Sequence, residues 1–439
     1  MRCPLPSKKL LLGLGIAGVI LLLPGRVASA LPLGIALNAL LLLLAMLDAT
    51  MSVRGGQIQV TRALPSRLYT GVANSISVCV ENHARRPLRA RVRDDYPPGF
   101  AVSPPELACR VPPVSRGTLT YHVTAPGRGE VSFGSTWLRW NSPMGLLLWQ
   151  HAWPGTATRS VYPRAFDYSR YALEQRAHLM RQPGARRLRS IVSGGDFESL
   201  REYVPGDDPR RIDWKATARH DRLVCRNYEE ERSKTIIVMV DCGRMMAPVA
   251  DGLSKLDHAI NATLMLASAA IAHSDRLGIV AFHHSVERYQ APRGDRAQIN
   301  RLLDALYDLQ PRLVEPDYAG AFAFLNAHHR RRSLVVLITD LIDEAASEAL
   351  LSGVAALRPA HLPLLVAIRD ESVERAAVDP LDSVASVYRR AVAEEVLLDR
   401  AAALHRLRSR GVVTVDAAPR AISIATVNQY LALKAENRI

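Results

Sequence analysis

The sequence Thr-Ile-Ile-Val-Met-Val at residues 235–240 is a continuous apolar run that ends at Asp241. Runs of this length without polar alternation are typical of strands buried on both faces of a sheet. A second run of this kind covers residues 334–339 and ends at Asp340. The two runs predict two buried strands, each with an aspartate at its carboxyl end.

The chain around these runs alternates between strand and helix patterns. Further strand patterns lie at 277–282, 364–368 and 412–415, and helix patterns lie at 255–274, 297–309, 318–328, 345–357 and 421–434. In the first of these helices Leu256, Ile260 and Leu264 recur at a spacing typical of a buried helix face. This alternation predicts an α/β domain over residues 233–439, with a doubly wound parallel sheet covered on both faces.

A segment dense in opposite charges, residues 194–232, precedes this domain. It begins Gly-Gly-Asp-Phe-Glu-Ser-Leu-Arg-Glu-Tyr-Val-Pro-Gly-Asp-Asp-Pro-Arg-Arg-Ile-Asp-Trp-Lys-Ala-Thr-Ala-Arg. Runs made only of charges are usually solvated, but here apolar residues are interleaved. The segment is therefore able to dock on a core while its charges pair, and Pro205 to Pro209 predict a fixed turn within it.

This segment closely resembles the signature of the domain-of-unknown-function 58 family. In that family the signature precedes a von Willebrand factor A-like domain, so the resemblance implies that fold for the α/β domain. Proteins of this type are often linked with MoxR-type AAA+ ATPases and are thought to act with them in assembling or maturing other proteins. The resemblance implies such a partner, and it assigns the family motif and interaction residues to Glu202, Tyr203, Gly206, Asp207, Asp208, Arg210, Arg211, Asp213, Trp214 and Arg219.

Three aspartates of the motif, Asp207, Asp208 and Asp213, lie close together in the sequence. Paired carboxylates are able to act as acid and base or to hold a metal. Four cations are equally near, and they favour ionised, salt-bridged carboxylates: Arg210, Arg211, Lys215 and Arg219. We expect a structural or partner-docking role here, with catalysis as the alternative.

Ligands of open parallel sheets bind beyond the carboxyl ends of the strands, where Asp241 and Asp340 lie. In von Willebrand factor A-like domains this position often holds magnesium, which prefers oxygen ligands. The expected Asp-x-Ser-x-Ser loop is absent, because Gly243 and Met245 stand in place of the serines, and Pro316 stands in place of the threonine. We therefore expect a degenerate metal site at best and no cofactor, with hydrated magnesium on the two aspartates as the alternative.

A positive side chain is the expected substitute for the missing metal. Arg244 follows Asp241 by three residues, and its planar guanidinium matches a carboxylate. The hypothesis is that Arg244 neutralises this site.

Residues 55–163 show short alternating apolar runs separated by proline and glycine. This pattern predicts an antiparallel, immunoglobulin-like β-sandwich domain, with strands near 76–80, 88–92, 119–123 and 131–138. Its role is either binding or spacing. Cys79 and Cys109 fall in this domain, and we expect free thiols in a reducing cytosol, with a disulfide as the alternative in an oxidising compartment.

Residues 164–193 are predicted to be a basic connector. Arginines crowd this region, and the chain carries a net charge of +14, which suggests an acidic partner or an anionic membrane surface. A solvated linker helix is the alternative. We expect no nucleic-acid partner, because no recognition motif accompanies the charge. Counted from residue 159 to residue 189, the arginines are Arg159, Arg164, Arg170, Arg176, Arg181, Arg186, Arg187 and Arg189.

Residues 1–54 contain two apolar runs, at about 10–26 and 27–47, which predict two transmembrane helices forming an N-terminal hairpin. The alternative is a cleaved signal peptide, because Ala28-Ser29-Ala30 has the form of a cleavage site. Basic residues flank the pair on both sides, so the positive-inside rule favours a cytoplasmic body on a multi-pass protein of the bacterial inner membrane.

The function expected from the sequence is that of a non-enzymatic, membrane-anchored adaptor or scaffold that works with a MoxR-type AAA+ ATPase on client proteins. One alternative is a hydrolase-like enzyme that uses Asp207, Asp208 or Asp213. The other is an envelope adhesion module with the body outside. The sequence indicates neither the client nor the oligomeric state.

Overall fold

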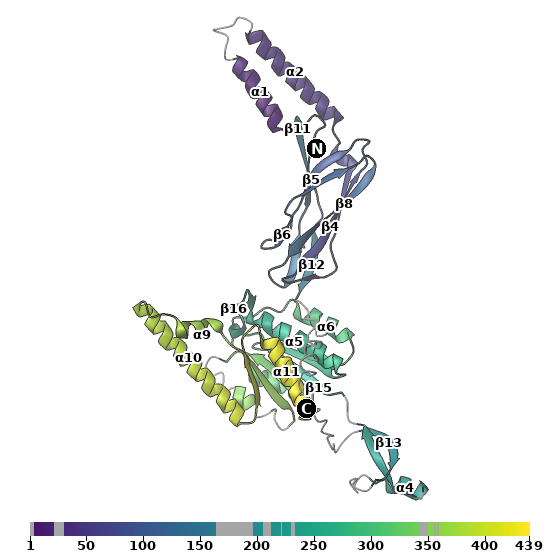
Figure 1. The fold of residues 1–439 in the computed structure, drawn as a ribbon, viewed down its shortest axis with the longest axis vertical. Helices are drawn as coiled ribbons and strands as arrows, with labels where there is room; N and C mark the ends of the chain where they lie inside the picture. The colour runs from purple at the N-terminus through teal and green to yellow at the C-terminus, as the bar shows by residue number, and fades with distance from the viewer. Residues whose placement is uncertain are drawn as a thin grey trace, which may run out of the picture. The chain divides into compact units, whose positions relative to one another are not determined.

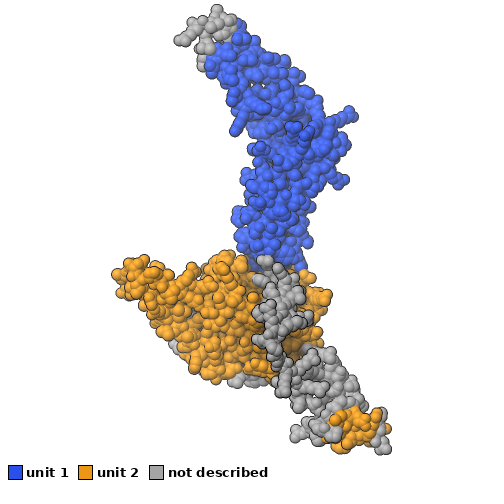
Figure 2. All heavy atoms as spheres, viewed as in Figure 1, with its two compact units in different colours: residues 1–164 blue, residues 165–439 orange. Residues whose placement is uncertain are grey.

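The apolar run that ends at Asp241 forms β15 (Thr235–Asp241), in which every residue from Ile236 onward is buried. It belongs to a computed structural model that describes residues 4–21, 30–163, 196–204, 212–220, 222–229, 233–341, 350–354, 357 and 360–439. The chain divides into two compact units, residues 1–164 and 165–439 (Figure 2). Each unit is described by itself.

The second unit contains a six-stranded sheet in the order β19-β18-β15-β20-β21-β22. Counted in chain order within this sheet, the strands lie as 3-2-1-4-5-6, and only β19 runs antiparallel to its neighbour. The order reverses between β15 and β20, which makes that point a topological switch point. The other bounds are β18 Arg276–Phe282, β19 Val286–Arg293, β20 Leu334–Thr339, β21 Leu362–Ile368 and β22 Val413–Ala417.

Helices cover both faces of this sheet (Figure 1). α5 (Lys255–Ala272) and α11 (Ile422–Ala435) pack against each other and against the sheet. A core that includes Met239 and Phe282 also takes in side chains of α7 (Tyr318–His328) and α10 (Val384–Ser409). The remaining helices are α6 (Ala297–Leu306) and α9 (Glu371–Val378).

Three of these elements differ from the sequence prediction, which contains no strand at 286–293 and no helix at 371–378 or 384–409. β19 lies at the edge of the sheet and is half exposed, so it lacks the continuous apolar run of the buried strands. The first half of α10 is mostly exposed, and its buried side includes Arg400. Both patterns depart from the apolar periodicity that sequence reasoning depends on.

The charged segment forms a two-stranded antiparallel sheet of β13 (Asp196–Glu202) and β14 (Val224–Glu229), with α4 (Trp214–His220) between them in sequence. Two backbone hydrogen bonds continue the pairing, from Tyr203 N to Leu223 O at 2.9 Å and from Asp213 N to Val224 O at 2.9 Å. The described part of the segment is therefore a hairpin with a helix inserted in its loop.

The first unit contains β-sheets around one core, and their strands pair antiparallel except for β3 and β12, which are parallel. Its main sheets have the orders β1-β11-β10-β5-β7 and β2-β4-β8-β6, and a smaller sheet has the order β3-β12-β9. Along β4 (Asn74–Asn82) every second residue is buried, including Ile76, Val78 and Val80, as the alternation predicts. The remaining bounds are β1 Leu5–Pro6, β2 Ile58–Ala63, β3 Leu68–Tyr69, β5 Leu88–Asp94, β6 Ala101–Ser103, β7 Leu107–Val111, β8 Ser115–Thr124, β9 Gly129–Phe133, β10 Thr136–Asn141, β11 Leu147–Trp153 and β12 Ala157–Tyr162.

The single strand expected at 131–138 is wrong, because the chain leaves one sheet at Gly134 and enters another. β9 ends at Phe133 and β10 begins at Thr136 in a different sheet. Gly134 N donates to Asp95 O at 2.8 Å, and a Cβ atom at Gly134 would lie 2.1 Å from Asp95 Oδ2. A side chain at this crossing would force the side chain of Asp95 to move. Cys79 and Cys109 are both free and half-buried.

Two apolar helices, α1 (Lys8–Leu21) and α2 (Ala30–Met51), contact each other and the end of this β domain. The buried carboxylate of Asp48, in α2, accepts hydrogen bonds from Met144 N at 2.8 Å and Leu146 N at 3.1 Å, and one from Ser142 Oγ. By length and composition, one helix of the described chain is able to cross a membrane, and it covers Pro32–Gln57. Asp48 thus fixes the carboxyl end of α2 on the turn between β10 and β11.

Some of the sequence expectations lie outside the described residues. They are the basic connector at 164–193, the turn at 205–209, Ala28 and Ser29 of the cleavage motif, and most of the helix expected at 345–357.

Candidate functional site

The two predicted carboxylates lie at the switch point of the six-stranded sheet. Asp241 is the last residue of β15, and Asp340 directly follows β20, its parallel neighbour. Both are almost completely buried, with exposed fractions of 0% and 3%. The prediction that these two strands end in aspartates at one edge is confirmed, and each carboxylate has its own set of partners.

Asp241 accepts hydrogen bonds from uncharged donors. Gly243 N donates to Oδ1 at 2.7 Å, Thr339 Oγ1 donates to Oδ2 at 2.6 Å, and Tyr318 Oη donates to Oδ2 at 3.2 Å. Tyr318 and Thr339 also contact each other, at 2.9 Å between their oxygens. Hydroxyl groups therefore do reach Asp241, but they come from two residues that sequence reasoning missed.

Gly243, which the sequence resemblance sets in place of a serine, is closely packed. A Cβ atom there would lie 3.0 Å from each of Asp241 Oδ1, Pro316 Cδ and Val314 O. Pro316 thus packs closely against the loop that follows Asp241.

Asp340 is paired with two buried cations. Lys255, the first residue of α5, places Nζ 2.6 Å from Asp340 Oδ2 and 2.6 Å from Asp370 Oδ2. Its side chain is 1% exposed. A lysine at a helix N-terminus opposes the helix dipole, so the two carboxylates provide the charge that stabilises it there.

Arg400, on α10, contacts the carboxyl ends of three neighbouring strands. Nη1 donates to Asp340 Oδ1 and to Leu341 O, each at 2.7 Å, beyond β20. Nη2 donates to Ile368 O at 3.0 Å in β21 and to Asp416 Oδ1 at 2.9 Å in β22. We call Lys255, Asp340, Asp370, Arg400 and Asp416 the switch-point charge cluster.

The surroundings shift the pKa values of these groups in opposite directions. Burial raises the pKa of Asp241, although the hydrogen bonds from Thr339, Gly243 and Tyr318 oppose the shift. Burial and then the charge of Asp241 raise the pKa of Tyr318 well above its usual value. Burial alone would also raise the pKa of Asp370, but the hydrogen bonds from Lys255 and Ser372 lower it to about 2.

The hypothesis that Arg244 supplies the positive charge is wrong. Arg244 Nη2 pairs with Glu315 Oε1 at 2.6 Å, and both side chains are half or more exposed. The positive charge beside Asp340 comes from Lys255 and Arg400. Each of the two has a sequence feature that could have indicated its position. Lys255 directly follows a helix-capping serine, and Arg400 lies on the buried face that also contains Leu404 and Leu407.

The residues of the charged segment occupy a separate place in the fold. Glu202 ends β13, and Tyr203 follows it. Asp213 precedes α4, which begins at Trp214 and contains Arg219. Gly206, Asp207, Asp208, Arg210 and Arg211 lie outside the described residues.

Asp213 caps α4 with its side chain. Its Oδ1 accepts a hydrogen bond from Ala216 N at 3.1 Å, and its backbone carbonyl accepts one from Thr217 N at 2.8 Å. Asx residues commonly have this role at helix starts. It accounts for Asp213 without catalysis.

The switch-point charge cluster is suited to holding strand ends together. Asp340 already receives hydrogen bonds from an ammonium and a guanidinium, so its oxygens are occupied by the chain's own cations. Within the described ranges, no group of three or more His, Cys, Asp or Glu side chains is arranged to hold a metal ion.

Comparisons with known proteins support the family resemblance of the charged segment. The family model described as "Protein of unknown function DUF58" matches residues 199–377, a stretch that runs from β13 into α9. Uncharacterized protein Rv1480 of Mycobacterium tuberculosis (strain ATCC 25618 / H37Rv) is 29% identical over 248 residues, which cover 54% of this chain and 77% of that protein. Uncharacterized protein YeaD of Bacillus subtilis (strain 168) is 29% identical over 126 residues, which cover 28% of this chain and 31% of that protein.

Among solved structures, a conserved hypothetical protein, BatB from Bacteroides thetaiotaomicron, aligns with 45% of this chain and 100% of its own at 13% identity and a TM-score of 0.27. The chain spans about a third of the length of the Bacillus relative. Residues 199–377 of this chain are thus similar to the DUF58 family of proteins of unknown function, as the charged segment indicates.

Proposed function

We propose that the protein is a non-enzymatic, membrane-anchored adaptor that works with a MoxR-type AAA+ ATPase in the assembly or maturation of other proteins. Its body faces the cytoplasm of a bacterial cell, and its two N-terminal helices cross the inner membrane. The partner comes from the family resemblance of the charged segment. The other parts are supported by the following observations.

The N-terminal helices support the membrane anchor. α2 has 22 residues, about the number that spans the hydrocarbon core of a bilayer. α1 has 14 residues and contacts α2, which supports the proposed hairpin. Large apolar side chains on both helices are exposed, as lipid-facing side chains would be; examples are Leu12 at 66%, Val19 at 59%, Leu42 at 59% and Met46 at 70%.

The sheet topology supports a von Willebrand factor A-like domain in the adaptor. The strand order places Asp241 and Asp340 at the switch point, where open α/β sheets bind ligands. In this chain Gly243 is tightly enclosed, and Lys255 lies between two carboxylates. We propose that the domain has exchanged metal binding for an internal ion cluster and has kept the fold as a platform.

The observation that carries the partner-binding role is an apolar stripe on the first half of α10. Its members are Val384, Val387, Tyr388 and Val392, with exposed fractions of 74%, 49%, 72% and 58%. Spacings of three and four residues place them on one side of the helix. Contiguous exposed apolar surface of this kind marks interaction sites, and a helix that presents it is able to dock in an apolar groove.

The test is co-purification from detergent-solubilised membranes of cells that express a MoxR-type ATPase, with and without ATP. We expect nucleotide-dependent association that the double variant Tyr388→Ser/Val392→Ser abolishes while the free energy of unfolding stays nearly unchanged. Ile424→Ser on α11 is the matched control, because Ile424 is also exposed, at 44%. Association that survives the double variant, or that never occurs with such an ATPase, would contradict the proposal.

A further inference from the structure

A basic cavity lies beside the start of α1. It has a volume of about 800 Å³ and is lined by the residues around the start of α1 and by side chains of β5, β7 and β10. Six of its lining residues are cations, and none is an aspartate or glutamate. These cations are Lys8, Lys9, Arg89, Arg91, Arg110 and Arg139. We call the cavity that they line the basic cavity.

The strand register brings these cations together in pairs of like charge. Arg89 on β5 lies directly opposite Arg110 on β7, and Arg91 on β5 lies directly opposite Arg139 on β10. Like charges in directly opposed positions destabilise a sheet. The fold therefore concentrates positive charge here at a cost, unlike a surface where opposite charges alternate.

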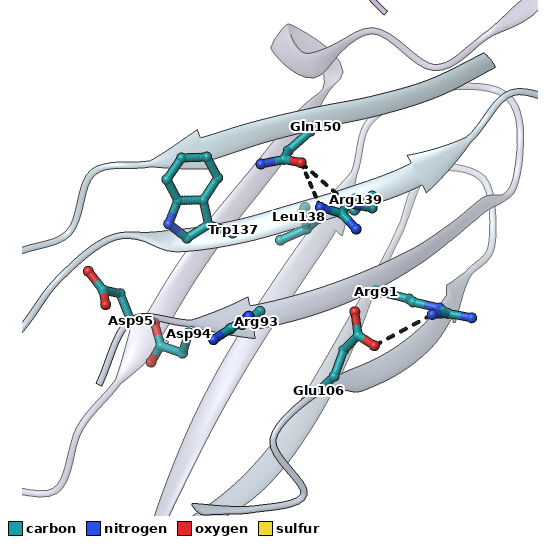
Figure 3. A pocket seen from close by; sticks show the side chains of 9 residues that line it. All are labelled: Arg91, Arg93, Asp94, Asp95, Glu106, Trp137, Leu138, Arg139 and Gln150. Atoms are coloured by element: carbon teal, nitrogen blue, oxygen red, sulfur yellow. Dashed lines mark hydrogen bonds and ion pairs between the residues drawn. The ribbon is translucent and has the colours of Figure 1, made fainter. Parts of the chain in front are cut away.

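Neighbouring side chains offset little of this charge. Arg139 bonds the uncharged Gln150 at 2.9 Å (Figure 3). Arg91 lies 3.5 Å from Glu106, and these two side chains are 68% and 47% exposed. Within the ranges that the structure describes, Lys8, Lys9, Arg89 and Arg110 have no ion pair. A neighbouring depression shares Arg91 and Arg139 with the cavity and also contains Asp94, Asp95 and Glu106. Asp94 is already paired with Arg62 at 2.8 Å.

The cavity lies where the chain enters its apolar helices. Lys8 is the first residue of α1, and Leu5 just before it pairs with Leu148 of β11, which holds the segment against the sheet. Asp48 fixes the end of α2 on the adjacent turn through Met144 N and Leu146 N. If α1 and α2 span the bilayer, the basic cavity lies at the level of the lipid headgroups.

We propose that the basic cavity binds the phosphate headgroup of an anionic phospholipid in the leaflet from which α1 and α2 enter. Guanidinium groups bind phosphate oxygens in bidentate fashion. A bound headgroup offsets the repulsion between Arg89 and Arg110 and fixes the depth of the β domain at the membrane. This inference rests on the membrane anchor of the proposed function and adds a ligand to it.

The experiment uses the full chain in nanodiscs of phosphatidylcholine that contain increasing fractions of phosphatidylglycerol. The readouts are the phosphatidylglycerol retained in native mass spectrometry and the thermal unfolding midpoint followed by tryptophan fluorescence. We expect both to rise with the fraction of phosphatidylglycerol. A juxtamembrane cation contributes about 1 kcal/mol, so Arg89→Gln/Arg110→Gln should weaken retention roughly 30-fold.

Two further variants test whether misfolding or a change in net charge explains a loss of retention. Lys8→Gln/Lys9→Gln leaves the sheet unchanged, so its loss of retention would not reflect misfolding. Arg116→Gln/Arg296→Gln removes the same net charge from exposed positions outside the cavity lining, and it should retain phosphatidylglycerol like the parent.

Equal retention of phosphatidylcholine and phosphatidylglycerol, or equal loss in the Arg116→Gln/Arg296→Gln control, would overturn the proposal. Competition by soluble glycerol 3-phosphate at the same total phosphate would assign the cavity to a free anion, which also overturns it. A chain that fails to float with neutral vesicles would instead refute the anchor, so the two failures are distinguishable.

Discussion

At the scale of single residues, Asp241 and Asp340 are buried carboxylates at the ends of two neighbouring strands, and their electrostatic environments are opposite. Asp241 is surrounded by hydroxyl and amide donors, whereas Asp340 is surrounded by Lys255 and Arg400. Burial without a neighbouring cation favours the protonated form of a carboxyl group. Asp241 therefore destabilises the fold at neutral pH relative to its protonated form.

This difference predicts the behaviour of Asp241→Asn. Because the pKa of Asp241 is raised in the folded chain, its contribution to stability is present below the ordinary aspartate pKa and is lost as the pH rises through the folded value. At a pH near the ordinary aspartate pKa we expect the variant to lose no more than about 1 kcal/mol. As the pH rises the difference should shrink or reverse, as measured by urea unfolding of parent and variant in the same detergent.

The comparison of parent and variant is its own control, because all other titratable groups are the same in both chains and cancel in the difference between their free energies of unfolding. A loss of stability in Asp241→Asn that is the same at every pH would show that hydrogen bonding, and not ionisation, decides the contribution of Asp241.

Lys255→Met should lower the free energy of unfolding far more than Asp241→Asn does. It leaves Asp370 without its cation and Asp340 with only Arg400, and the loss of one partner from a buried ion pair costs about 3–5 kcal/mol. Arg390→Met is the control, because Arg390 also pairs with a carboxylate, Glu394, at 2.8 Å, but the two side chains are 40% and 52% exposed. Urea unfolding should separate the two variants clearly.

The same variant should change the response to acid. The pKa of Asp370 is lowered to about 2, so its stabilisation is present above the ordinary aspartate pKa and is lost as the pH falls towards about 2. Lys255→Met should therefore show less acid destabilisation than the parent over that interval, and an unchanged acid response would contradict the pairing.

At the scale of elements, Arg400 connects helix α10 to the ends of β20, β21 and β22. Strand ends leave carbonyl groups that need donors, and the planar guanidinium supplies four hydrogen bonds in fixed directions. One side chain thereby fixes the relative positions of three parallel strands at the edge where their loops begin.

Arg400→Lys should lose this connection although it keeps the charge. A single ammonium cannot reach both Asp340 and Asp416 together with two carbonyls, so buried acceptors remain without donors. We expect a loss of about 2 kcal/mol or more and faster hydrogen exchange in β22 than in β15. Arg408→Lys on the exposed side of the same helix should change stability by less than about 0.5 kcal/mol, and equal effects of both variants would contradict this account.

At the scale of the whole molecule, the orientation in the membrane decides which partners are accessible. The proposed cytoplasmic body predicts that Arg116→Cys, at an exposed position of the β domain, reacts with a membrane-impermeant maleimide only after spheroplasts are broken. A permeant maleimide should label both samples. Labelling of intact spheroplasts beyond that of the parent chain would place the body outside and favour the adhesion alternative.

The sequence by itself determined the elements whose pattern is local. Complete burial of β15 and β20 follows from continuous apolar runs, and the strands of the β domain follow from alternation, since each pattern depends only on neighbours along the chain. The charged segment indicated the family similarity. The apolar runs indicated that Asp241 and Asp340 lie at the carboxyl ends of strands. The sequence did not predict β19 or α10, which depart from these patterns.

Only the tertiary structure decided what the two aspartates contact. Lys255 and Arg400 reach Asp340 across 85 and 60 residues of sequence, and Tyr318 and Thr339 reach Asp241 across 77 and 98 residues. The pairing of Arg89 with Arg110 likewise follows from strand register. Such contacts depend on which strands become neighbours, because long-range packing, and not local periodicity, sets which side chains a buried charge meets.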